Sequence, residues 1–227
     1  GDAREAFSVR GDPDFDASRL SDEQRTWYER FWRSLDNPRG LIPDRMAASD
    51  DTYVYARDLH SHLQTLLIVF RATGDLRILD EVDRLTGIMA GELRAEWRGT
   101  KDGSDGRQKY RGWRYYYEGS EYVGKDTHQV NELKTHAIIV AVLYALEQNR
   151  DLASPGGRDY AGSADFWMDY IQNEFEPKWR ERLDRRSGYP LISRPHTHTY
   201  FSGLKYHYYM YKLTGDEDAL AEARRQT

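Results

Sequence analysis

The segment at residues 137–146, AIIVAVLYAL, is apolar on every side of the helix that it would form. A helix without a polar face is stable only where protein surrounds it. The segment is shorter than the roughly 20 residues of a membrane-spanning helix, and no apolar run in the chain approaches that length. We therefore expect a helical domain built around this segment, with no membrane partner.

Polar side chains precede this segment and share one face of the same helix. Their spacing of three or four residues places them on one side. A helix that begins with imidazole and amide groups and ends in a buried run is typical of a pocket wall. The alternative is a set of helix-end residues that reach solvent, and one helix does not decide between the two. These polar residues are His128, Asn131, Glu132, Thr135 and His136.

Buried and half-exposed helices alternate along the chain, and a turn sequence repeats between them. ATGDLRILDEV at 72–82 and LTGDEDALAEA at 213–223 each place a Thr-Gly-Asp turn before an amphipathic helix. Gly74 occupies the position where a left-handed residue ends a helix. Repeated helical hairpins predict a solenoid or a ring. We expect buried helices at 51–73, 128–147 and 199–213, and amphipathic helices at 76–97, from 160 onward with a kink or break at Pro177, and from 219 onward.

The expected fold class is all-α, with helical hairpins that form an (α/α) toroid or barrel, or part of one. Residues 51–227 form this domain, which we expect to be incomplete at the C-terminus because the chain ends within an outer helix. Residues 1–50 form a lead-in with one helix, which is capped at Ser21 and continues through Trp27 and Trp32.

Composition narrows the possible functions. A formal net charge of -5 and an isoelectric point near 5.8 argue against a general nucleic-acid-binding protein. The absence of cysteine leaves no disulfide and no thiolate ligand or nucleophile. The N-terminus has no signal-peptide pattern, but a removed signal leaves the same sequence, so we expect a secreted or periplasmic protein. The 17 Tyr and 6 Trp are many for a chain of mean hydropathy -0.87, and such rings often bind flat or amphipathic ligands.

Two long segments between the expected helices are basic and aromatic. Residues 98–125 hold seven basic and four acidic residues, and residues 184–197 add arginines and a histidine. Both lead into helix starts, whose partial positive charge favours anions. They predict a cleft for an anionic chain such as a polyuronate, and a solvated loop is the alternative interpretation of 98–125. The expected substrate-binding residues are Arg57, His62, Trp113, Arg114, Tyr115, His128 and His198.

The sequence RPHTHTY at 194–200 brings a guanidinium, two imidazoles and a phenol together at a helix start. Together with the hairpins from residue 51 onward, it resembles the polysaccharide lyases built on α/α toroids, the alginate and glucuronan lyases, and family 38 of the polysaccharide lyases in particular. The shared features are an arginine six residues before a tyrosine on one inner helix, and an asparagine and a histidine on an earlier one.

This resemblance implies a catalytic set in the present chain. Tyr200 is the implied base and acid, while Asn131, His136 and Arg194 are the implied groups that neutralise the substrate carboxylate. The pattern departs from some toroid lyases, in which the asparagine and histidine are adjacent, because here they are five residues apart. No cofactor and no metal are implied, and the implied partner is an anionic polysaccharide.

The implied reaction is β-elimination. The proton beside a uronate carboxylate is barely acidic until hydrogen-bonding or cationic groups offset the carboxylate charge. Arg194 suits this role because its guanidinium is always charged and binds a carboxylate through two hydrogen bonds. A tyrosine is a poor base until nearby cations lower its pKa, and Arg194 with His196 or His198 provides such cations. The same phenol then protonates the departing sugar oxygen.

The sequence leaves three other functions open. A toroid glycoside hydrolase needs two carboxylates about 5–10 Å apart, and no pair among the available acidic residues stands out. A sugar epimerase needs two histidines, for which His136 and His198 are available. A non-catalytic carbohydrate-binding module needs only stacking rings. The acidic residues near the expected site are Asp58, Glu118, Asp126 and Glu132.

A metal site is not expected from the histidine pairs. His60 and His62, like His196 and His198, are two residues apart, which on a helix points the two rings about 200° apart. Only an extended backbone brings the two rings of such a pair together. We therefore expect the two rings of each pair to face different environments.

Overall fold

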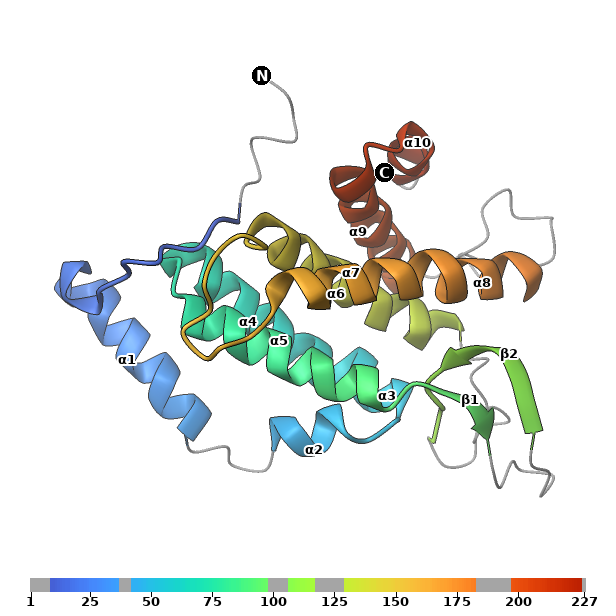
Figure 1. Ribbon diagram of the computed structural model, residues 1–227, viewed down its shortest axis with the longest axis horizontal. Helices are drawn as coiled ribbons and strands as arrows, with labels where there is room; N and C mark the ends of the chain where they lie inside the picture. The colour runs from blue at the N-terminus through green and yellow to red at the C-terminus, as the bar shows by residue number, and fades with distance from the viewer. Residues whose placement is uncertain (1–8, 37–41, 98–105, 117–128, 183–196, 226–227) are drawn as a thin grey trace.

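The computed structural model describes residues 9–36, 42–97, 106–116, 129–182 and 197–225. These residues are mostly helical with little strand, which confirms the all-α prediction (Figure 1). None of the described helices is both long and apolar enough to cross a membrane. In chain order the elements are η2 (Ala17–Arg19), α1 (Asp22–Asp36), α2 (Pro43–Ala47), α3 (Thr52–Val54), η3 (Tyr55–Leu59), α4 (His60–Thr73), α5 (Leu76–Gly91), β1 (Arg94–Trp97), β2 (Gly106–Gly112), α6 (Gln129–Gln148), α7 (Tyr160–Tyr170), η4 (Ile171–Phe175), α8 (Glu176–Arg182), α9 (Thr197–Thr214) and α10 (Glu217–Arg225).

Three helical hairpins make up most of the described chain. α4 packs against α5, α6 against α7, and α9 against α10. α6 lies between α4 and α9 and contacts both, and its run at 137–146 is buried throughout, as the sequence predicts. The first helices of the three hairpins are therefore neighbours, with α6 in the middle.

α4 and α6 run in the same direction. Near the start of each helix, Nδ1 of His60 lies 3.1 Å from the carbonyl oxygen of Lys134. Toward the end of each helix, the guanidinium of Arg71 lies within electrostatic reach of the phenol of Tyr144. Since the contacts follow the same order along both helices, the two leading ends lie on the same side of the molecule.

α9 follows the same direction as α4 and α6. Nζ of Lys205 donates to Oε1 of Gln64 over 3.1 Å, and further along both helices Arg71 lies within electrostatic reach of Tyr209. The three helices thus run in the same sense, and side chains from their first halves face a common region.

The repeated Thr-Gly-Asp turn has the same structure at both places. Gly74 has a φ of 74° and ends α4, as predicted. Thr73 donates its hydroxyl to the Val69 carbonyl over 2.8 Å, and Asp75 accepts from the Arg77 amide over 3.0 Å to cap α5. The same hydrogen bonds recur at 214–216, where the glycine φ is 72°. The sequence repeat therefore encodes a repeated hairpin turn.

Gly74→Ala is expected to lower the free energy of unfolding by more than Gly157→Ala does. Both glycines are left-handed, with φ of 74° and 71°, and that conformation costs a non-glycine residue about 1–2 kcal/mol. A Cβ at Gly74 also lies 3.1 Å from the backbone nitrogen of Asp12, whereas a Cβ at Gly157 meets nothing within 4 Å. Urea denaturation of the two variants measures the difference, and equal losses contradict the close contact with Asp12.

The lead-in at residues 1–50 differs from the prediction in two ways: it contains a second helix, and its first described residues are bound to the hairpin turns. Ser21 caps α1 as expected, and the cap is reciprocal with Gln24 through bonds of 3.0 and 3.3 Å, but α2 adds a second helix before residue 51. Residues 9–12 lie across the hairpin turns, since the amide of Asp12 donates to the Gly74 carbonyl over 2.8 Å. The side chain of Asn149 binds this segment further through Val9 and Gly11.

The helix expected at 76–97 is shorter than predicted. α5 ends at Gly91, and β1 begins at Arg94 and pairs antiparallel with β2. The indole of Trp113 donates to the Met89 carbonyl over 2.9 Å at the end of α5. Contacts with residues distant in the sequence therefore override the helical pattern of residues 92–97. Part of the irregular segment expected at 98–125 is accordingly a strand.

The break expected near Pro177 is a π-helical turn. η4 occupies Ile171–Phe175, between α7 and α8, and the amide of Glu176 bonds the carbonyl of Ile171. Proline has no amide hydrogen, so it cannot continue the ordinary ladder to the residue four positions earlier. One wider turn absorbs this loss while the helix continues.

Candidate functional site

Several residues expected at the site lie outside the described part of the chain. Among them are Arg194, His196 and His128. The side chain of His198 also lies outside the described part. Of the implied catalytic set, the structure therefore describes the side chains of Asn131, His136 and Tyr200.

His136 is a sealed core residue. It has no exposed surface, and its ring stacks on Phe175 with centroids 3.5 Å apart and planes 8° apart. Its Nδ1 lies 2.7 Å from the Glu132 carbonyl. Burial lowers the pKa of His136 to about 3, so the ring is neutral at pH 7. The expected role in neutralising a carboxylate does not fit this position, because α6 turns His136 toward η4 and away from α4.

Glu132 is also engaged inside the fold. Nζ of Lys178 lies 2.8 Å from its carboxylate, and neither side chain has any exposed surface. The indole of Trp179 donates to the same carboxylate over 2.8 Å. Glu132 therefore fixes α8 against α6 and is not available as a hydrolytic carboxylate.

The expected aromatic ligand surface at 113–115 is core instead. Trp113 has no exposed surface, and its ring packs edge-on against Tyr55 with centroids 5.1 Å apart. Arg114 is 2% exposed and donates to the carbonyls of Gly112 and Arg94 over 3.4 and 3.3 Å. Tyr115 is buried as well. Substrate binding by Trp113, Arg114 and Tyr115 does not fit these positions, because the three residues join the β-hairpin to α3, η3 and α5.

Arg57 and His62 lie on different sides of the α3–η3–α4 helix. Arg57 is largely exposed, and its guanidinium lies 4.9 Å from the centroid of the Tyr53 ring. His62 turns toward Glu81 of α5, and burial lowers its pKa. Its position therefore does not fit the expected contact with a ligand bound beside α6. His60 faces α6 instead, so the two histidines point apart, as the spacing of two predicts.

The shared face of α4, α6 and α9 holds a polar cluster that the sequence analysis missed. We call it the inner cluster, and it consists of His60, Gln64, Lys134 and Lys205. Nε2 of His60 lies 3.2 Å from Oε1 of Gln64, the same oxygen that accepts from Lys205. The signals for it were the spacing of four between His60 and Gln64 and a single lysine within the aromatic run at 200–211.

The inner cluster carries positive charge, and the described part of the chain places no carboxylate within electrostatic reach of His60 or Lys205. Burial lowers the pKa of Lys205 to about 8, so its ammonium is still mostly charged at pH 7. Burial, then the charges of Lys205 and Lys134, lower the pKa of His60 to about 4. Within the described ranges, neither ammonium forms an ion pair with a carboxylate. Such a face favours an anionic ligand.

Helix geometry relates the remaining residues to this cluster. Asn131 is one turn before Lys134 on α6, and Phe201 is one turn before Lys205 on α9. Phe201 is 67% exposed. Tyr200 is 38% exposed, but it is five residues before Lys205, which places it about 140° further round α9. Helix spacing thus places Asn131 on the same side of α6 as Lys134, whereas Tyr200 leaves a different face of α9 from Lys205.

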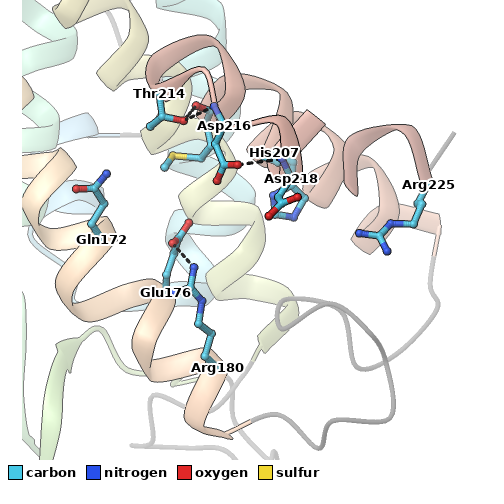
Figure 2. A pocket seen from close by; sticks show the side chains of 10 residues that line it. Gln172, Glu176, Arg180, His207, Thr214, Asp216, Asp218 and Arg225 are labelled. Carbon is cyan, nitrogen blue, oxygen red and sulfur yellow. Dashed lines mark hydrogen bonds and ion pairs between the residues drawn. The ribbon is translucent and has the colours of Figure 1, made fainter. Parts of the chain in front are cut away.

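A separate cleft lies between η4–α8 and α9–α10, with a volume of about 520 Å³ (Figure 2). Glu176 and Asp216 both line it. The carboxylate of Glu176 accepts from the Tyr206 hydroxyl over 2.9 Å and from Arg180 over 3.0 Å, and burial raises its pKa. No local sequence pattern links these two carboxylates, because Glu176 begins α8 and Asp216 caps α10, 40 residues further along the chain.

The chain matches no protein-family model, no curated protein and no solved structure.

Proposed function

We propose that the protein is a polysaccharide lyase that cleaves a uronate polymer, alginate or glucuronan, by β-elimination. In this proposal the three hairpins belong to an (α/α) toroid or to part of one, and the polymer lies against the shared face of α4, α6 and α9. The observation that carries it is the inner cluster, whose ammonium groups have no carboxylate partner in the described chain. Uronate polymers are extracellular, which suits a secreted or periplasmic protein.

The residues of the shared face suit the demands of elimination. The ammonium groups of Lys205 and Lys134 and the amide of Asn131 offset the charge of the uronate carboxylate, which makes the adjacent proton removable. The phenol of Tyr200, which is exposed on another face of α9, is our candidate for the base, and for the acid that protonates the leaving oxygen. Phe201 offers an exposed ring for stacking on the polymer.

The test is to incubate the protein with polymannuronate, polyguluronate, glucuronan and hyaluronan and to record ultraviolet absorbance. β-Elimination leaves a double bond beside the carboxylate, so absorbance rises as the chain is cut. New reducing ends without this absorbance contradict the lyase and indicate a hydrolase. Binding of the polymer without any cleavage indicates a carbohydrate-binding module.

A hydrolase is the second candidate, because of the cleft in Figure 2. Glycosidases pair a protonated carboxylic acid with a carboxylate that stays ionised. Glu176, with its raised pKa, suits the acid, and Asp216 faces the same cleft. If reducing ends appear, Glu176→Gln should abolish them and leave the folded protein intact by circular dichroism.

A further inference from the structure

The ring of His60 faces an oxygen atom at each of its two nitrogens. Nδ1 lies 3.1 Å from the Lys134 carbonyl oxygen, and Nε2 lies 3.2 Å from Oε1 of Gln64. A neutral imidazole has one N–H, so only one of these contacts is a hydrogen bond. Exchanging the oxygen and nitrogen of the Gln64 amide would give the ring a donor at Nε2. It would also place the NH₂ group against the ammonium of Lys205, which donates to Oε1 over 3.1 Å. Only a protonated ring satisfies both oxygens.

The surroundings nevertheless hold this ring neutral. His60 is half-buried, and the charged groups that act on it are Lys134 on α6 and Lys205 on α9. Both are positive, while Gln64 on its own helix is uncharged. Among the described residues, no carboxylate acts on the ring. The site therefore has hydrogen-bond acceptors for a second proton but lacks the negative charge that would retain it.

We propose that a carboxylate ligand binds at the inner cluster together with one proton, which His60 takes up from solvent. The proton adds to the ring nitrogen that lacks one, and His60 then donates to both the Lys134 carbonyl and Gln64. The net charge of the site changes by zero, because the ligand brings one negative charge and the proton one positive charge. The choice of a uronate as the ligand rests on the proposed function, whereas the proton uptake rests on the geometry of His60.

The physical cause is the reversal of the local field. A negative charge within about 4–6 Å favours the charged form of a histidine and raises its pKa by 1–3 units. Lys205 gains a partner at the same time and is drawn from Gln64 toward the ligand. At pH 5.5 Lys205 is already protonated and free His60 is mostly neutral, so proton uptake at that pH reports on His60.

The experiment is isothermal titration calorimetry with D-glucuronate at pH 5.5, in two buffers of different ionisation enthalpy. The monosaccharide has no glycosidic bond, so elimination cannot contribute heat. We expect uptake of about 0.2 to 0.9 proton per glucuronate bound. Binding without proton uptake overturns the proposal, and so does the absence of binding at millimolar glucuronate.

Two variants separate His60 from its neighbour. His60→Gln keeps hydrogen-bonding groups but cannot titrate, so proton uptake should disappear while weakened binding remains. His62→Gln, two residues away and facing α5, should leave the uptake unchanged. Uptake that persists in His60→Gln assigns the proton elsewhere and overturns the proposal.

A measurement on the unaltered protein covers the case in which His60→Gln does not fold. The His60 imidazole resonance, followed by nuclear magnetic resonance against pH, should titrate at a pKa at least one unit higher with glucuronate than without it. An unchanged pKa overturns the proposal. The lyase assay and these tests can give different results. Proton-linked binding without unsaturated product makes the inner cluster a uronate-binding site and contradicts the lyase. Unsaturated product without proton uptake supports the lyase and overturns the role of His60.

Discussion

Replacing Lys178 with methionine is expected to lower the free energy of unfolding by about 3–5 kcal/mol, because it leaves the carboxylate of Glu132 buried without its ammonium partner. Both side chains lie wholly inside the protein, 2.8 Å apart. The Trp179 indole donates to the same carboxylate but carries no charge. Urea denaturation followed by circular dichroism measures the loss.

Two further variants establish the cause of this loss. Lys109→Met breaks an ion pair with Glu181 whose side chains are 67% and 53% exposed, and should cost less than about 1 kcal/mol. The double variant Glu132→Met with Lys178→Met removes both charges, and should recover much of the stability lost by Lys178→Met alone. A Lys178→Met loss as small as that of Lys109→Met contradicts a buried pair.

This buried pair connects the fold to the proposed site. Glu132 lies in the first turn of α6, directly after Asn131 and two residues before Lys134. By tying this turn to α8, the pair fixes the orientation of α6 where the helix meets α4 and α9. Loss of the pair should therefore also weaken ligand binding at the inner cluster, through position and not through direct contact.

The fold was predictable wherever the decisive interactions are local. The N-cap at Ser21, the left-handed Gly74 and the repeated Thr-Gly-Asp turn depend on neighbours within a few residues, and all are confirmed. The burial of 137–146 followed because no face of that helix is polar. The β-hairpin was missed because its second strand and Trp113 lie far along the chain from Arg94.

The site was harder to predict because it depends on which way each side chain faces. Asn131 and His136 were grouped on one face of α6, yet they are five residues apart and leave the helix about 140° from each other. His136 stacks on Phe175 of η4, a partner that no local pattern indicates. No sequence motif includes Lys205, and only the approach of Gln64 from α4 gives it a role.

In the proposed lyase, Tyr200→Phe is expected to lower kcat on the preferred uronate polymer by about 10²–10⁴-fold, because it removes the group that transfers the proton. Oligosaccharide binding should be largely retained, since the ring remains. Tyr211→Phe on the same helix is the matched control and should leave kcat within about threefold. The measurement is the initial rate of ultraviolet absorbance increase at saturating polymer.

Lys205→Met tests the other half of the same chemistry. It removes a cation from the carboxylate-binding face, so kcat/KM should fall by about 10²–10³-fold, while Lys205→Arg, which keeps the charge, should recover part of the loss. The two positions are five residues apart on α9 and leave different faces of it. If Tyr200→Phe stays active while both Lys205 variants are inactive, the base is the amine of Lys205 and not Tyr200. The pKa of Lys205, about 8, suits a base. Arginine cannot replace it in that role because a guanidinium stays protonated.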